Sequence, residues 1–301
     1  MNATLLWKPT LAATLPPDAD LTELPYPLLA SPKIDGVRAL VQRGVLVSRK
    51  GRPIANTNAQ KRFGRPSYKG LDGELTAGPP WGKDVFNKTV RVTQRRDADG
   101  SGLIFNVFDW VGAHGLDQGL KTRQAGLKEF YDGYKDVHLV RQTLIRDAAA
   151  LLRYEAKQLA KGYEGVMLRR ADAGPYLQKR STLREFSLVK LKRMEHGMAT
   201  LLRCFPLRHN DNTEKTATGR RTTAKAGIRE DKQLVGSVEM VDDRTGAVFT
   251  VNVATAELRA WPGWRGHDVW RGKRVRYKYQ PVGTLGDGAP RFPTATFEEL
   301  L

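Results

Sequence analysis

Cysteine, long apolar runs and acidic residues are all scarce in this sequence, and each shortage excludes a class of protein. The one cysteine, Cys204, rules out an internal disulfide and a cysteine-based zinc site. No apolar run reaches the roughly eighteen residues that a transmembrane helix needs. The N-terminal stretch is interrupted by Lys8, Pro9 and Pro16, unlike a signal peptide. We therefore expect a cytoplasmic protein that makes no use of a membrane.

The shortage of acidic residues leaves a strongly basic chain. Lys and Arg number 50 against 32 Asp and Glu, which gives a formal charge of +18. Such a charge indicates a polyanionic partner, either nucleic acid or an acidic membrane surface. No amphipathic basic helix stands out, which disfavours the membrane. The P-loop pattern G-x-x-x-x-G-K-[ST] is also missing, so a nucleotide would have to be bound in another way.

The length and the pattern of the chain indicate two domains. Its 301 residues suffice for two, and apolar residues, at 40%, suffice for a core in each. Residues 1–194 mix strand-like and helix-like segments, so we expect an α+β domain with antiparallel sheets. Residues 195–301 hold about five short β-like runs, which suggests an all-β barrel such as an OB-fold. Inside it, residues 206–233 are polar and Thr-rich and predict a long loop, either disordered or functional.

Local patterns predict the elements of the first domain. The alternating residues 37–49, broken at Gly44, predict a β-hairpin. Helical periodicity predicts helices over 122–134 and 146–162, the second with Gly162 as its C-cap. Apolar runs predict further strands, at 70–75, 102–111, 163–170 and 186–193.

The stretch "KIDGVR" places a lysine, Lys33, among apolar residues beside a predicted strand. A lysine attacks an electrophile only in its neutral form, which burial or neighbouring cations favour. Gly36 would allow a tight turn near phosphates, and Arg38 could hold a phosphate or a ribose. The simpler interpretation, that Lys33 is a solvated lysine on an edge strand, stays open for this motif alone.

Three further stretches carry carboxylates or an aromatic residue at a strand. In "LDGEL", Asp72 and Glu74 share one face of a strand and could bind a metal or a sugar hydroxyl, although a turn explains "DG" as well. Phe108, in "NVFDW", could stack on a purine, although most such residues lie in a core. Glu164, in "YEGVMLRR", precedes a strand and points toward its mouth, although it could be a surface glutamate.

The stretch "LVKLKRM" carries Lys190 and Lys192 two positions apart on a strand, so both face the same way. Two ammonium groups on one face repel each other unless an anion lies between them. A solvated strand face is the alternative for this motif in isolation.

Taken together and in order, these stretches resemble the motifs of the covalent nucleotidyltransferases. The motifs are K-x-D-G-x-R, D-G-E, F-D, E-G-V-M and K-L-K. Within that superfamily the chain resembles the ATP-dependent DNA ligases over nearly its whole length, and especially the minimal ligases of large DNA viruses and phages. The resemblance implies an adenylation domain followed by an OB-fold. It also implies sealing of nicks in duplex DNA through lysyl-AMP, with ATP and Mg²⁺ or Mn²⁺.

The resemblance also implies a role for each matching position. Catalytic roles fall on Lys33, Asp35, Arg38, Lys190 and Lys192. Binding of ATP or AMP involves these residues except Asp35, and adds Ser31, Pro32, Ile34, Glu74, Phe108 and Met167. Glu74 and Glu164 would hold the metal. Contacts to nicked DNA fall on Arg38, Arg49, Arg52, Arg184, Arg208, Arg220, Arg221, Lys225 and Arg229.

Segment 206–233 matches the insertion that forms a DNA latch in the viral ligases, which implies a monomer that encircles DNA. The family's last motif continues beyond "RFP" for longer than this sequence does. That difference leaves open whether Arg291, or Arg276 and Lys278, assist the attack of the lysine.

Two alternatives use some of the same features. An mRNA-capping guanylyltransferase shares K-x-D-G and an OB domain, but it uses GTP and needs no latch. An inert nucleic-acid-binding protein would explain the charge, but it has no need of Lys33, Glu74, Glu164, Lys190 and Lys192 together.

Overall fold

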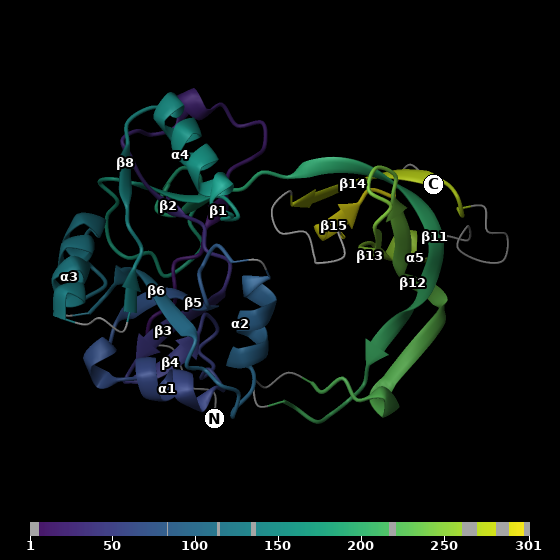
Figure 1. Ribbon diagram of the computed structural model, residues 1–301, viewed down its shortest axis with the longest axis horizontal. Coiled ribbons are helices and arrows are strands. Elements are labelled where there is room, and N and C mark those ends of the chain that lie inside the picture. The colour runs from purple at the N-terminus through teal and green to yellow at the C-terminus, as the bar shows by residue number, and fades with distance from the viewer. Residues whose placement is uncertain are drawn as a thin grey trace. The chain divides into compact units, whose positions relative to one another are not determined.

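The structure is a computed structural model that describes residues 6–82, 84–112, 115–133, 137–216, 221–260, 270–280 and 289–297. The chain divides into two compact units, Met1–Lys192 and Arg193–Leu301, and each has hydrophobic cores of its own (Figure 1). Within the described residues, none of the helices combines the length and the apolar character needed to cross a membrane.

The described residues of the first unit form two five-stranded sheets. One sheet has the order β4-β3-β5-β6-β7, and every neighbouring pair in it is antiparallel except β6 with β7. Its strands are β3 (Val37–Gln42), β4 (Val45–Ser48), β5 (Leu71–Ala77), β6 (Leu103–Trp110) and β7 (Val137–Leu139). The other sheet has the order β1-β10-β9-β2-β8, with only β1 and β10 parallel. Its strands are β1 (Ala13–Thr14), β2 (Leu28–Pro32), β8 (Thr143–Ile145), β9 (Val166–Arg170) and β10 (Val189–Leu191).

Within the part of this unit that the structure describes, four α-helices pack on these sheets: α1 (Thr57–Phe63), α2 (Val85–Thr93), α3 (Leu120–Gly133) and α4 (Ala148–Ala160). Phe63 of α1 and Leu127 of α3 enter the core of the β3 sheet, whereas Leu151 of α4 enters the core of the β2 sheet. Asp147 caps α4 by accepting a hydrogen bond from the Ala150 N–H at 2.7 Å, and the chain leaves the helix through Gly162 at φ +95°.

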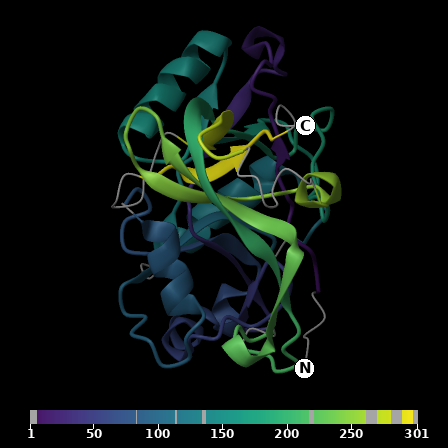
Figure 2. The ribbon, with the colours of Figure 1, turned by 90° about the vertical axis from the view of Figure 1, so that its right-hand side faces the viewer.

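The second unit is built on one antiparallel sheet of order β13-β12-β11-β14-β15. Its strands are β11 (Glu195–Asn210), β12 (Ile228–Asp242), β13 (Val248–Asn252), β14 (Arg274–Gln280) and β15 (Arg291–Ala295), with the short helix α5 (Ala256–Ala260) after β13. β11 and β12 pair along most of their length as a long curved ribbon (Figure 2).

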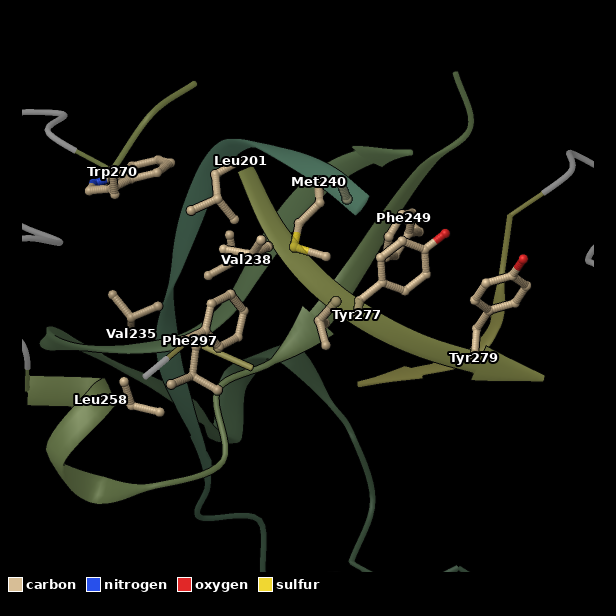
Figure 3. Close-up of a cluster of buried hydrophobic side chains, with 14 of the residues drawn as sticks. Leu201, Val235, Val238, Met240, Phe249, Leu258, Trp270, Tyr277, Tyr279 and Phe297 are labelled. Carbon is tan, nitrogen blue, oxygen red and sulfur yellow. The ribbon is translucent and has the colours of Figure 1, made fainter. Parts of the chain in front are cut away.

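The core of this unit gathers side chains from all of its larger elements, with Leu258 of α5 at one end and Tyr279 of β14 near the other (Figure 3). The Tyr277 hydroxyl donates to Asp242 at 2.5 Å, and the same carboxylate caps the turn that follows β12. Among the described residues the edge strands β13 and β15 are not hydrogen-bonded to each other, so no closed barrel is found.

The predicted hairpin at 37–49 is present as β3 and β4, and Arg43 and Gly44 form its turn at positive φ. The two predicted helices are also present, as α3 and α4, whereas α1 and α2 were not predicted. The prediction of a long loop at 206–233 was wrong at both ends, because β11 continues to Asn210 and β12 begins at Ile228. Cross-strand ion pairs such as Arg208–Glu230, at 3.0 Å, hold the polar extension together.

Candidate active site

A pocket of about 260 Å³ in the first unit receives side chains from both sheets. The β2 sheet contributes Ser31, Met167 and Lys190, and the facing sheet contributes Glu74 and Phe108. The other lining residues include most of the remaining predicted nucleotide contacts, and they are Leu11, Ala12, Pro32, Lys33, Ile34, Arg38, Arg49, Arg169, Arg180 and Leu188. Five motifs that are far apart in the sequence therefore meet around one cavity or directly beside it.

Lys33 follows the last residue of β2, where its N–H donates to the Gly165 carbonyl at 2.8 Å. Its ammonium group pairs with the Glu164 carboxylate, and Lys192 pairs with the other oxygen of that carboxylate at 2.9 Å. Burial alone would raise the pKa of Glu164, but the two lysines outweigh it and lower this pKa to about 2. Glu164 therefore stays ionised at neutral pH and holds Lys33 at the edge of the pocket.

A glycine is required at position 36 because neighbouring atoms leave no room for a side chain, and not because of its φ angle. This corrects the expectation of a glycine-dependent turn. Its φ lies outside the left-handed region, but a Cβ at this position would lie 2.1 Å from the Leu75 carbonyl oxygen. The close approach of the loop to β5 brings the segment after Lys33 against Glu74.

Replacing Gly36 with alanine should therefore lower the free energy of unfolding by about 2 kcal/mol or more, because the clash involves backbone. The matched control is Gly102→Ala, where an added Cβ would meet nothing within 4 Å. That change should stay within about 0.5 kcal/mol. Urea denaturation of both variants checks the difference, and equal midpoints would contradict it.

Arg38 is fixed by a buried acidic partner. Its guanidinium donates from two nitrogens to Asp72, at 2.6 and 2.7 Å, and the Tyr176 hydroxyl donates to the same carboxylate at 2.5 Å. Although burial opposes its charge, Asp72 holds the pKa of Arg38 above the ordinary value. The guanidinium carbon also lies 4.5 Å from the centre of the Phe108 ring. One charged residue thus borders both the aromatic and the polar parts of the pocket.

Beside Phe108 lies a second buried pair, which involves Arg169. This guanidinium is 5.9 Å from the Phe108 ring centre and donates to Asp109 at 2.5 Å. Arg123 donates to the other Asp109 oxygen at 2.9 Å. Burial would raise the pKa of Asp109, but the two arginines hold it below its usual value.

Glu74 and Lys190 have shifted pKa values inside the pocket. Enclosure raises the pKa of Glu74 to about 7, although Arg38 and Lys33 act in the opposite direction. Burial, aided by Lys33 and Lys192, lowers the pKa of Lys190. Perturbed groups that converge on one cavity are typical of functional sites.

Some predicted residues lie apart from the pocket. Lys192 does not line it and instead pairs with Glu164, so the anion beside this lysine is a protein carboxylate. Asp35 is half-buried in the loop after Lys33, and Arg52 lies close to the end of β4. Arg184 is exposed on a turn outside the pocket.

Two arginines that line the pocket were missed. Arg169 follows Met167 by two positions on β9, so strand periodicity could have placed it on the same face. Arg180 donates to the Ala12 carbonyl, 168 positions away in the sequence. No local pattern could have signalled that contact.

The metal prediction has limited support from the side chains. No group of three or more His, Cys, Asp or Glu residues in the described parts of the chain is arranged around a metal site. Both oxygens of Glu164 are engaged by lysines, whereas Glu74 lines the pocket. Because Mg²⁺ can be bound by one carboxylate and the substrate's phosphates, Glu74 beside a nucleotide fits such an ion.

The predicted DNA contacts of the second unit lie around the end of the β11–β12 ribbon. Arg208 and Arg229 pair with Glu230 and Asp211, each at 3.0 Å. Arg221 donates to the Asn210 carbonyl at 2.7 Å, and Lys225 is exposed. Arg220 lies outside the described residues, as does the side chain of Arg291, whose backbone begins β15.

Comparisons with known proteins agree with this geometry. The sequence model of the family described as "ATP dependent DNA ligase domain" matches residues 9–192. None of the curated protein sequences matches the chain. A solved structure of chlorella virus DNA ligase-adenylate is 27% identical, with 97% of this chain and 98% of that chain covered and a TM-score of 0.55.

A structure from a study of Lig E DNA ligases is 22% identical, with 97% of this chain and 99% of that chain covered and a TM-score of 0.69. That likeness concerns the fold. The family match, in contrast, spans more than half of the sequence and contains the Lys33 pocket. The chain therefore belongs to the ATP-dependent DNA ligase family.

Proposed function

We propose that this ligase seals nicks between a 3′-hydroxyl and a 5′-phosphate in duplex DNA, with Lys33 as the nucleophile that ATP adenylates. The convergence of Lys33, Glu74, Phe108 and Lys190 on one pocket carries this proposal. It provides an amine, a carboxylate for a sugar, an aromatic face for a base and a cation for a phosphate.

The reaction divides into three displacements at phosphorus. The deprotonated Nζ of Lys33 attacks the α-phosphorus of ATP, and an N–P bond forms as the bond to pyrophosphate breaks. The 5′-phosphate at the nick then attacks the same phosphorus, which breaks the N–P bond and returns the lysine. Finally the 3′-hydroxyl attacks the activated 5′-phosphorus, and AMP leaves. A divalent ion bound with ATP would offset the charge of its phosphates.

The pocket residues have separate roles in this scheme. Phe108 stacks on adenine with Met167 nearby, Glu74 accepts a hydrogen bond from a ribose hydroxyl, and Ser31, Pro32 and Ile34 border the nucleotide. Arg38, Arg49, Arg180 and Lys190 hold phosphate oxygens, as cations that line one cavity can do. Glu164 orients Lys33 and is too weak a base, at a pKa of about 2, to hold a proton at neutral pH.

A nick-sealing assay tests the proposal directly. The chain, incubated with a labelled nicked duplex, Mg²⁺ and ATP, should produce the sealed strand and should carry label from α-labelled ATP on a denaturing gel. Label from GTP instead would support a capping-type enzyme. Label from neither nucleotide would overturn the proposal.

Nucleotide binding should depend on the ionisation of Glu74. Because the pKa of Glu74 is about 7, its carboxylate forms as pH rises through neutrality. Adenosine, which does not itself titrate there, should bind about tenfold more tightly above pH 8 than below pH 6, as expected for a hydrogen bond to a charged group. Glu74→Gln should remove that dependence in a calorimetric titration, and a pH dependence that persists would exclude Glu74 as the cause.

The same ionisation should affect folding with the opposite sign. The folded-state pKa of Glu74 lies above its ordinary value of 4.5, so protonation of this side chain favours the fold. That contribution is complete below about pH 4.5 and is lost as pH rises through about 7.

We further propose that the second unit is an OB-fold and that segment 206–233 contacts the DNA backbone, so that a monomer encircles the duplex. The basic and hydroxyl side chains of the segment suit phosphate and sugar contacts. Deleting residues 208–231 should leave adenylation of Lys33 within about twofold of the intact chain, but it should weaken nick binding at least about tenfold. Label transfer and a gel-shift assay measure the two effects. Unchanged nick affinity would contradict the proposed contact.

A further inference from the structure

A second pocket, of about 390 Å³, adjoins the first and has no part in the reaction described above. Pro32 and Ile34 line both pockets, so the two meet at the segment that carries Lys33. The rest of its wall comes from α4 with the adjoining Lys161, the β7–β8 segment and Tyr163. The helix α4 and the strand β8 belong to the first unit (Figure 1). Its volume falls in the range of small-molecule sites.

The wall formed by α4 has a regular pattern. Three residues of α4 and the C-cap recur at the spacing that places side chains on one helix face, and all of them line the pocket: Tyr154, Lys157, Gln158 and the C-cap Lys161. Tyr163 lines it as well, and the half-exposed Trp81 packs edge-on against that ring with centroids 6.0 Å apart. One side of the pocket is therefore aromatic, with ammonium groups beside it.

The described lining residues make the pocket electropositive. Arg141, Lys157 and Lys161 are exposed at its edge, and the described lining contains no Asp or Glu. None of these three cations forms an ion pair with a carboxylate of the described residues. Burial lowers the pKa of His138, so its ring adds no charge at neutral pH, and its Nδ1 lies 3.0 Å from the Asn106 side-chain oxygen.

We propose that this second pocket binds a nucleoside monophosphate unit, with the base against Tyr154 and Tyr163 and the phosphate among Arg141, Lys157 and Lys161. Aromatic faces bind any base by stacking, and clustered cations bind the phosphate. The unit comes either from a free nucleotide such as AMP or from the DNA strand. If the unit belongs to DNA, the inference rests on the proposed function. If it is a free nucleotide, the inference does not.

The experiment uses the full chain, adenylated with ATP so that the first pocket is occupied. Calorimetric titration with AMP should show one further site per chain. Lys157→Ala/Lys161→Ala should weaken that site at least tenfold. Arg153→Ala/Lys128→Ala removes the same charge from exposed positions on α4 and α3 and should leave the site unchanged. Ribose 5-phosphate should bind at least tenfold more weakly than AMP, and equal affinities would overturn the placement of the base.

Nicked duplex DNA, followed by fluorescence anisotropy, separates the two sources. A site for AMP that is lost in the Lys157/Lys161 variant supports a free nucleotide. No AMP binding, with nick affinity reduced at least tenfold in that variant but not in the control, supports a nucleotide of the DNA. No AMP binding with equal nick affinities for the two variants would overturn the pocket. A chain that fails to become adenylated would count against the proposed function instead, and unmodified chain would then be titrated for two AMP sites.

Discussion

Lys33→Ala should form no lysyl-AMP and should seal nicks roughly 10⁴-fold more slowly or worse, because loss of a covalent nucleophile has effects of that order. Lys33 lines the pocket that receives side chains from both sheets of the first unit, and Lys190, the other lysine of the described lining, lies on β10. The measurement is transfer of label from α-labelled ATP, followed by nick sealing under the same conditions.

A matched variant distinguishes the loss of the nucleophile from the loss of an ion pair with Glu164. Lys192→Ala also removes a partner of Glu164 but leaves Lys33 in place, so it should retain measurable adenylation. A nick that already carries AMP on its 5′-phosphate bypasses the attack by Lys33, so Lys33→Ala should lose far less activity on that substrate than on ATP and an unmodified nick. Equal adenylation of Lys33→Ala and the unmodified chain would exclude the assigned nucleophile.

Asp109→Ala should destabilise the protein by about 3–5 kcal/mol, which is the expected effect of removing one partner from a buried ion pair. The carboxylate of Asp109 is almost wholly buried and accepts hydrogen bonds from both Arg123 and Arg169. Its removal leaves two buried guanidinium groups without their shared anion, and that of Arg169 lies 5.9 Å from the centre of the Phe108 ring. Urea denaturation, fitted with a common slope, measures the loss of unfolding free energy.

The control for Asp109→Ala is another aspartate that pairs with arginine. Asp172 pairs with Arg170 at 2.7 Å, but its side chain is 70% exposed. Asp172→Ala should therefore leave the urea midpoint close to that of the unmodified chain, because an exposed ion pair adds little to stability. Similar losses for the two variants would show that burial does not determine the contribution of the Asp109 pairs.

The first unit was the more predictable from sequence, because its signals are local. Alternation around Gly44 and the capping residues of α4 each act within a few residues, and both elements form as expected. The motifs also include several residues that line one pocket in the structure, whereas the roles assigned to them stay predictions. The adjoining Lys–Glu–Lys arrangement was not foreseen. Only the fold could show that Glu164 is the counter-ion of both Lys33 and Lys192.

Features that depend on distant contacts were missed. The resemblance implies a phosphate contact for Arg184, which stays a prediction, but it gave no sign of Arg180. This residue reaches the pocket because the chain returns to Ala12. The polar stretch 206–233, whose ends lie in β11 and β12, predicted a loop because its composition offers little to bury. Arg208 and Glu230, 22 positions apart, form an ion pair across the ribbon, and composition alone cannot predict such a pairing.

The paired charges on the β11–β12 ribbon change what its basic residues mean for DNA affinity. Counterions condensed on DNA are released in proportion to the phosphates that the protein neutralises, and the slope of log affinity against log salt reports that number. Arg208 and Arg229 already face Glu230 and Asp211, so each would have to exchange a carboxylate for a phosphate. In the DNA contact proposed above, the ribbon's share of counterion release would therefore be smaller than its number of basic residues suggests, and shape and hydroxyl contacts would supply more of the binding free energy.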